Sequence, residues 1–233
     1  MPRQINRWTV LSFAIAGLAL AWATAPASQV PARHYYIAAE DVVWDFAPSG
    51  KNLVHCMDMP VPCPIPAPWT NSHTFNKVRY IEYTDATFGT RKPQPEWLGA
   101  LGPIIRAEEG DTVNVRFCNR SKTGASYGMH PHGLRYTKAN EGAHYVGVNG
   151  GARPGAGSMV MPGECFDYSW IADADSAPGP GDLSSKVWWY HSHVDEPADT
   201  NLGLLGPIIV ARRVWPSQTG ARTTSIASSS RHS

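Results

Sequence analysis

The clearest pattern of hydrophobic and polar residues is the alternation over residues 111–118, DTVNVRFC. Val113, Val115 and Phe117 fall on one side of this segment, and polar residues fall on the other. A period of two residues is typical of a β-strand with one buried face. Residues 164–172, ECFDYSWIA, follow a Pro-Gly turn and have the same character. We expect them to form the antiparallel neighbour of the first strand.

Other segments have the β-branched and aromatic bias of strands, namely 34–47, 78–88, 187–194 and 206–213. Two related segments, LGALGPIIRA (98–107) and LGLLGPIIVA (202–211), differ at two positions, and each is expected to start a core strand after a Gly-Pro turn. The chain also has 21 glycines and 20 prolines and lacks long helical patterns. We therefore predict an all-β domain, a Greek-key β-sandwich or barrel.

The two ends of the chain depart from this pattern. Arg3 and Arg7 precede an apolar run over residues 8–23, and Ala25-Pro26-Ala27 offers a cleavage site, as in a secretory signal peptide. The last nine residues contain five serines and no apolar periodicity. We expect a signal peptide over 1–27, a single domain over 28–213 and a disordered tail over 214–233.

The charge balance excludes some classes of partner. The formal net charge is +1, and hydrophobic residues make up 42% of the chain. A full core can be buried, whereas neither nucleic acid nor an anionic membrane surface is indicated as a partner.

The four cysteines are expected to form two disulfides, because export leads to an oxidising compartment. Cys118 ends one predicted strand and Cys165 begins its neighbour, so their Cα atoms are expected about 4.4–6.8 Å apart. Cys56 and Cys63 flank a Pro-rich loop and are the second expected pair. A zinc site is less favoured, because no C-x-x-C spacing is present.

Four of the nine histidines form two H-x-H pairs, His130 with His132 and His191 with His193. Residues i and i+2 of a strand point to one face, and neutral imidazole is a common ligand for copper, zinc and iron. Two strands of a sandwich could bring both pairs to one edge; the alternative is that all four only hydrogen-bond to the backbone. Solvated or capping roles are expected for the isolated histidines, which are His34, His55, His73, His144 and His232.

HPHG followed by W-x-YHSH resembles the first cupredoxin domain of multicopper oxidases. The segments HYYIAAEDVVWDFAPSG, YTDATF, WLGALGPIIRAEEGDTV, NEGAHY and YHSHVDEPADTNLGLLGPIIVARR narrow the resemblance to the ceruloplasmin and hephaestin branch and its bacterial relatives. The resemblance covers about residues 34–213. It implies a cupredoxin-like fold.

The resemblance also implies a copper site. The four paired histidines would belong to a trinuclear centre that reduces O₂ to water, with His130 on the type 2 copper and His132, His191 and His193 on the type 3 pair. Such a centre takes four histidines from each of two domains, so a second cupredoxin domain, in this chain or another subunit, is the expected partner. Side chains expected to orient or wall the site are Asp195, Glu141, Trp189 and Tyr190.

The family oxidises its reducing substrate at a type 1 copper, whose Cys ligand stands between two histidines. Ser192 holds that position here, so no type 1 site is expected in this domain. The resemblance implies the amino-terminal part of a secreted or periplasmic copper oxidoreductase that takes electrons from Fe(II), Cu(I) or phenols. The alternatives are a copper-binding module without catalysis and a non-enzymatic domain similar to the clotting-factor A domains.

The resemblance stops at PIIVARR. The codons allowed from Val214 onward, read in a shifted frame, can encode VAKPDGSPHDVDREFVT, which is similar to the start of a second domain in the family. We therefore expect the tail to be out of frame, and sequencing of the gene tests this.

Overall fold

The computed structural model describes residues 31–53, 64–67, 69–70, 72–146, 152–153, 155 and 157–213. The expected signal peptide (1–27), the expected Cys56–Cys63 disulfide and the expected tail (214–233) lie outside the described residues.

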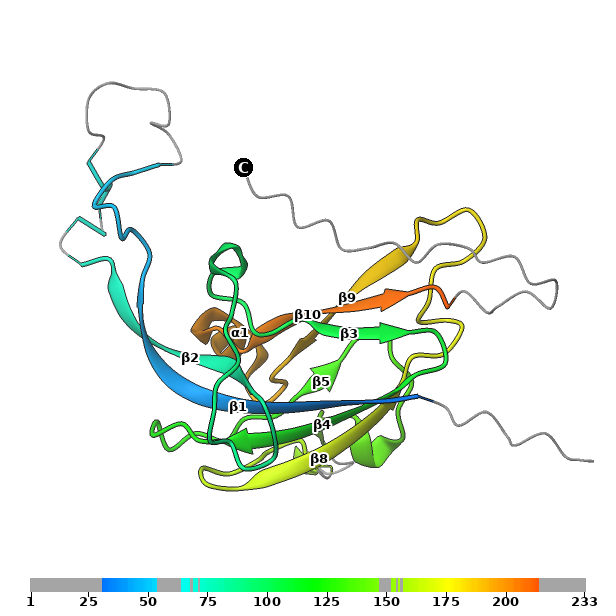
Figure 1. The fold of residues 1–233 in the computed structure, drawn as a ribbon. Helices are drawn as coiled ribbons and strands as arrows, with labels where there is room; N and C mark the ends of the chain where they lie inside the picture. The colour runs from blue at the N-terminus through cyan, green and yellow to red at the C-terminus, as the bar shows by residue number, and fades with distance from the viewer. Residues whose placement is uncertain are drawn as a thin grey trace, which may run out of the picture.

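The described chain forms two four-stranded sheets that lie over each other as two layers (Figure 1). One sheet has the strand order β2-β1-β4-β8 and the other β3-β10-β9-β5. Each sheet contains both parallel and antiparallel strand pairs. β1 runs parallel to β4, and β10 runs parallel to β3, while the other pairs are antiparallel. The expectation of an all-β sandwich is confirmed. The strands of the two sheets are β1 (Ala32–Asp45), β2 (Thr74–Tyr83), β3 (Ile105–Glu108), β4 (Thr112–Asn119), β5 (His130–Pro131), β8 (Cys165–Ile171), β9 (Ser185–His191) and β10 (Leu205–Ala211).

The remaining elements are short. A two-stranded ladder joins β6 (Tyr145–Val146) to β7 (Ala152–Arg153), and the helical elements are η1 (Glu96–Leu98), η2 (Lys138–Asn140) and α1 (Glu196–Leu202). Helices of this length cannot cross a bilayer, and the described part of the chain contains no longer one.

The core lies between the two sheets, and the alternation of β4 and β8 builds much of it. Val113, Val115 and Phe117 of β4 are fully buried, and Tyr168 and Trp170 of β8 join the same cluster. β4 and β8 pair antiparallel as expected. Burial of each such large apolar side chain contributes about 1.5–3 kcal/mol relative to exposure.

A disulfide joins β4 to β8 between Cys118 and Cys165, as expected. The two residues are direct partners in the ladder, and the amide of Asn119 donates to the carbonyl of Glu164 beside them. This is the more closely spaced type of antiparallel pair. The Cα–Cα distance of 4.0 Å is accordingly shorter than the range expected from the sequence.

The strand expected over 78–88 is displaced. β2 begins four residues earlier and ends at Tyr83, so the segment after it was predicted wrongly. Asp85 closes a turn there, because its carboxylate accepts hydrogen bonds from the amide and hydroxyl of Thr87. Phe88 then has a positive φ of 53°, which a strand does not allow.

The two related Gly-Pro-Ile-Ile segments lie side by side. They lead into β3 and β10, which pair parallel with Ile208 opposite Ile105, and both isoleucines are fully buried. The expectation that each segment starts a core strand is therefore confirmed. The Gly-Pro turn expected before the second strand is wrong, because Gly206 and Pro207 lie within β10 and pair with β9. The glycines of the two segments both lie against the side chain of Tyr190, Gly102 against its hydroxyl and Gly206 against its ring and hydroxyl. This shared contact gives a physical reason for the similarity of the two segments.

Candidate metal centre

Strand pairing brings the two H-x-H pairs to the same edge of one sheet. The two-residue strand β5 pairs with the end of β9, which places His130 directly opposite His191. The amide of His132 donates to the carbonyl of Trp189 at 2.7 Å. The pairing of this segment with β9 therefore continues past the end of β5. β9 ends at His191, so His193 lies just beyond the strand, where it forms a parallel bridge with Ala143.

The glycine of the HPHG segment allows this close approach. Gly133 has a φ of +70°, and a Cβ atom there would lie 2.0 Å from the indole of Trp188. Only glycine fits a positive φ and such a contact without strain. Trp188 itself is fixed by its indole N–H, which donates to the carbonyl of Ser176 at 2.8 Å. The segments that carry the two histidine pairs are thereby locked against each other.

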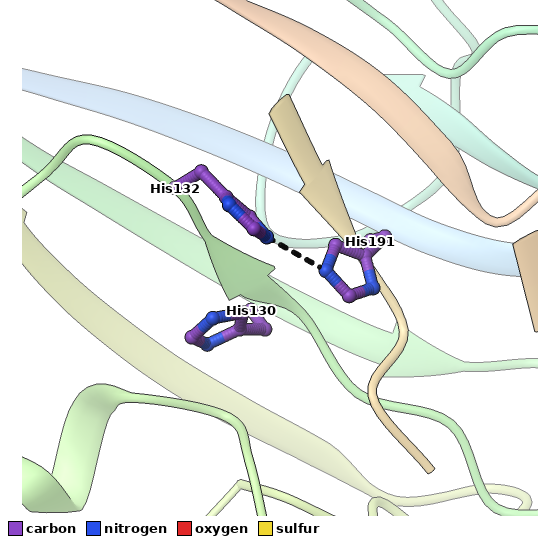
Figure 2. A group of neighbouring side chains, drawn as sticks. All are labelled: His130, His132 and His191. Atoms are coloured by element: carbon purple, nitrogen blue, oxygen red, sulfur yellow. Dashed lines mark hydrogen bonds between the residues drawn. The ribbon is translucent and has the colours of Figure 1, made fainter. Parts of the chain in front are cut away.

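The four imidazole rings form one cluster. Five of their six pairs have ring centroids 5.0–5.7 Å apart. The nearest nitrogens are Nε2 of His132 and Nε2 of His191, which are 2.9 Å apart (Figure 2). Figure 2 shows the rings of His130, His132 and His191 around one space, and their ligand atoms all lie within 4.8 Å of one another.

Backbone acceptors orient two of these rings for metal binding. Nδ1 of His130 lies 2.7 Å from the carbonyl oxygen of Glu141, and Nδ1 of His191 lies 3.0 Å from the carbonyl oxygen of Ser192. Because a carbonyl can only accept, each Nδ1 carries the proton. Nε2 of each ring is then directed to the cluster, in the arrangement usual for metal-ligating histidines.

Burial favours the metal-binding form of His130 and His132. Desolvation lowers the pKa of His130 below its ordinary value, and the positive charge that His132, His191 or His193 would carry lowers it further. Desolvation and His191 likewise lower the pKa of His132, although Glu196 opposes this shift. The neutral rings of His130 and His132 are therefore favoured at neutral pH, and a neutral ring is the form that coordinates a metal ion. The residues fit a metal centre.

His144 was expected to be an isolated, solvated histidine, and this expectation is wrong. Its ring lies 6.1 Å from that of His193, and it is partly buried. Nδ1 of His144 and Nδ1 of His193 are both buried without a hydrogen-bond partner. The cluster therefore has a fifth imidazole at its side, which no spacing pattern in the sequence indicated.

Ser192 anchors the turn between His191 and His193. Its buried hydroxyl donates to Oδ2 of Asp199 at 2.6 Å and accepts from the amide of Gly128 at 3.2 Å. Asp199 lies on α1 and also accepts from the amide of Asp195 at 3.2 Å. Ser192 thus connects the histidine turn to the helix and to the segment before His130.

Replacing Asp199 by alanine should destabilise the chain by about 1–3 kcal/mol, because the Ser192 hydroxyl and the Asp195 amide lose their acceptor.

Asp199→Asn keeps an acceptor but removes the charge, and burial raises the pKa of Asp199. A raised folded-state pKa means that ionisation costs stability as pH rises through it. Asp199→Asn should therefore gain stability relative to the wild type between pH 4 and pH 7. Urea unfolding of both proteins at pH 4 and at pH 7 measures this difference in the free energy of unfolding. If Asp199→Asn gained stability relative to the wild type as the pH fell from 7 to 4, the prediction would be contradicted.

Other side chains expected at the site have different roles. The carboxylate of Glu141 pairs with Lys138, and only its backbone carbonyl contacts His130. The Asp195 side chain caps α1 by accepting from the amide of Ala198. Tyr190 was expected to wall the site, but its ring is fully buried in the core and its hydroxyl donates to the carbonyl of Pro103.

Comparison with known proteins agrees with this geometry. A family model described as Multicopper oxidase matches residues 97–214, which is half of the chain and includes both histidine pairs. The chain belongs to the multicopper oxidase family. The resemblance found in the sequence is therefore confirmed, and the two mixed sheets are those of its cupredoxin-like domain.

Named relatives place this multicopper oxidase domain near the ferroxidases. It is 36% identical over 185 residues to human Ferroxidase HEPHL1, covering 77% of this chain and 16% of the relative. It is 37% identical over 193 residues to human Ceruloplasmin, covering 78% of this chain and 18% of that relative. A crystal structure of a multi-copper oxidase from Pseudomonas Thermotolerans has a TM-score of 0.48 and 22% identity, covering 78% of this chain and 30% of that one. The chain thus spans less than a fifth of the length of these curated relatives.

Proposed function

We propose that this chain supplies half of a trinuclear copper centre that reduces O₂ to water. His130 would bind the type 2 copper, and His132, His191 and His193 would bind the type 3 pair. The observation that carries the proposal is the convergence of these four rings at one sheet edge, with Nε2 of His132 and His191 2.9 Å apart.

The protein's own residues prepare this site. Nδ1 of His191 carries that ring's proton, so in the metal-free chain Nε2 of His132 donates a hydrogen bond to Nε2 of His191, and a bound metal ion would displace the donated proton. If two metal–nitrogen bonds of about 2.0–2.1 Å meet near a right angle, the two nitrogens lie about 2.9 Å apart. This matches the distance between Nε2 of His132 and Nε2 of His191. The rings of His132 and His191 therefore need little movement to bind one ion. Bound copper would supply the electrons for O₂ reduction, because it changes between two oxidation states.

The reductant would be oxidised elsewhere. Ser192 takes the place of a thiolate between the two histidines, and its hydroxyl is engaged with Asp199. We propose that a second cupredoxin domain, in the full-length protein or another subunit, contributes four more ligands and the route for electrons from Fe(II), Cu(I) or phenols. The Cys118–Cys165 disulfide and the kinship with ferroxidases support a secreted or periplasmic location.

Anaerobic copper loading of the native protein that contains this chain tests the proposal, followed by O₂ uptake with Fe(II), Cu(I) or a phenol. We expect about four electrons consumed per O₂ without release of peroxide, and loss of this activity in His132→Ala. Copper binding without O₂ uptake would instead support a copper-binding module without catalysis. Equal copper content in the wild type and His132→Ala would contradict the proposed site.

A further inference from the structure

A cavity lies where the chain leaves β1 and enters β2, and none of the clustered histidines lines it. β1 pairs with β4 only up to Ala39, so its last residues and the start of β2 extend beyond the neighbouring strands (Figure 1). The cavity has a volume of about 740 Å³. Sites for small molecules usually have volumes of about 300–1,000 Å³. The large apolar side chains that line it are Phe46, Leu53, Ile65, Trp69 and Phe75.

Hydrogen bonds and ring contacts build the walls of this cavity. The amide of Phe46 donates to the carbonyl of His73 at 2.9 Å, which continues the pairing of β1 and β2 into the lining. The rings of Phe46 and Phe75 meet edge to face with their centroids 5.7 Å apart. On the other side, the amide of Trp69 donates to the carbonyl of Pro66 at 3.0 Å and closes a turn.

The apolar side chains at the cavity are exposed although they are large. Phe46, Leu53 and Trp69 are 56%, 55% and 49% exposed. Single exposed apolar residues are normal on a protein surface, whereas several that gather at one concave place mark a binding site. We therefore expect an apolar ligand group to cover them.

The charges at the cavity are positive. Lys51 and Lys77 line it, and no Asp or Glu does. Nζ of Lys77 donates to the carbonyl of Asn201 at 2.7 Å and lies 5.2 Å from the centroid of the Phe46 ring. Within the described part of the chain, neither lysine forms an ion pair with a carboxylate, whereas other lysines do. The cavity thus lacks a negative charge that would balance its two ammonium groups.

We propose that this cavity binds a small amphipathic organic anion, whose apolar body packs against Phe46 and Trp69 and whose negative charge is attracted by Lys51 and Lys77. A second copy of the chain is a poorer occupant, because twofold symmetry would bring the same lysines opposite one another. Two lysines also fall short of the roughly four to eight basic residues typical of a surface that binds anionic lipid. This binding goes beyond the proposed function and needs no copper.

Calorimetric titration of the full chain with laurate, and with dodecyltrimethylammonium, tests this inference. The two probes carry an alkyl chain of the same length and opposite charges. Exposed charge pairs are weak individually, but here two lysines attract one probe and repel the other, so we expect laurate to bind at least about tenfold more tightly. Equal affinity for the two probes, or no binding of laurate, would overturn the inference.

Substitutions in the lining test where laurate binds. Trp69→Ala should weaken laurate binding by about tenfold, because tryptophan side chains at binding sites contribute strongly. Each of Lys51→Gln and Lys77→Gln should weaken it by about two- to fivefold, the contribution of an exposed charge pair. Trp69 and Lys51 are exposed, so the midpoints of thermal unfolding of their variants should match that of the wild type.

Trp97→Ala and Lys122→Gln are the matched controls, because both residues are exposed and neither lines the cavity. They should bind laurate like the wild type. If Trp97→Ala and Trp69→Ala lost affinity equally, laurate would bind without specificity for the cavity and the inference would be wrong.

Two further measurements distinguish the other occupants. Cosedimentation with vesicles of phosphatidylcholine and phosphatidylserine reports binding to a lipid surface, and sedimentation velocity reports association of two copies. We expect neither in the wild type. Vesicle binding or self-association that Trp69→Ala abolishes, without binding of laurate, would show that this surface has a different occupant and would overturn the inference.

Discussion

Replacing His191 by alanine is expected to lower the affinity of the chain for Cu(II) by more than about a hundredfold. Changes to groups that only support a metal ligand cost about 10–100-fold, and the loss of a ligand should cost more. His191 is central to the cluster, because its Nε2 faces His132 and its ring neighbours those of His130 and His193. Equilibrium dialysis with copper analysis measures the loss.

His73→Ala is the control for this prediction. His73 lies on another part of the surface, where its Nδ1 contacts Oδ1 of Asp45 at 2.5 Å, and it has no ring contact with the cluster. Its removal should leave copper binding unchanged. If His73→Ala and His191→Ala lose copper equally, binding is not specific to the cluster and the proposed site is wrong.

Replacing Gly206 by alanine should destabilise the fold by about 3 kcal/mol, at the upper end of the usual cost of overpacking. A Cβ atom at this position would lie 2.3 Å from Cζ of Tyr190, whose ring is fully buried. The side chain cannot retreat easily, because its hydroxyl lies against Gly102 and donates to the carbonyl of Pro103. Chemical denaturation measures the change in the free energy of unfolding.

The same substitution should weaken copper binding. Gly206 is paired with Tyr190 and Leu205 with His191, so a shift of β9 at Tyr190 moves the adjacent ligand. Gly179→Ala is the control, because its Cβ would meet only a carboxylate oxygen of Asp182 at an ordinary 3.6 Å. Unchanged stability in Gly206→Ala would show that the contact between β9 and β10 is looser than described.

Local sequence patterns were sufficient to predict the two strands that build most of the core. In β4 and β8 every second residue is apolar, and one face of each strand is buried, so the period alone identifies the strand and its inward side. The disulfide followed from the same pattern, because Cys118 and Cys165 stand at adjoining ends of the two strands. Here local preference and tertiary burial agree.

The histidine pairs could also be found from their spacing, but two neighbours of the cluster could not. His144 reaches His193 through a single bridge at Ala143, a contact between residues about fifty positions apart. Glu196 follows the ordinary pattern of an acidic helix start, which hides its contact with the rings. β5 has only two residues, too few for a periodicity, so the pairing that aligns His130 with His191 was not predictable either.

Anomalous scattering at the copper absorption edge, measured on crystals of the copper-loaded chain, tests the central claim most directly. We expect a peak bonded to Nε2 of both His132 and His191, at about 2 Å from each nitrogen. No comparable peak is expected at His34 or His73, which lie outside the cluster. Copper bound at those surface histidines, with none between His132 and His191, would contradict the assignment of this cluster as the copper site.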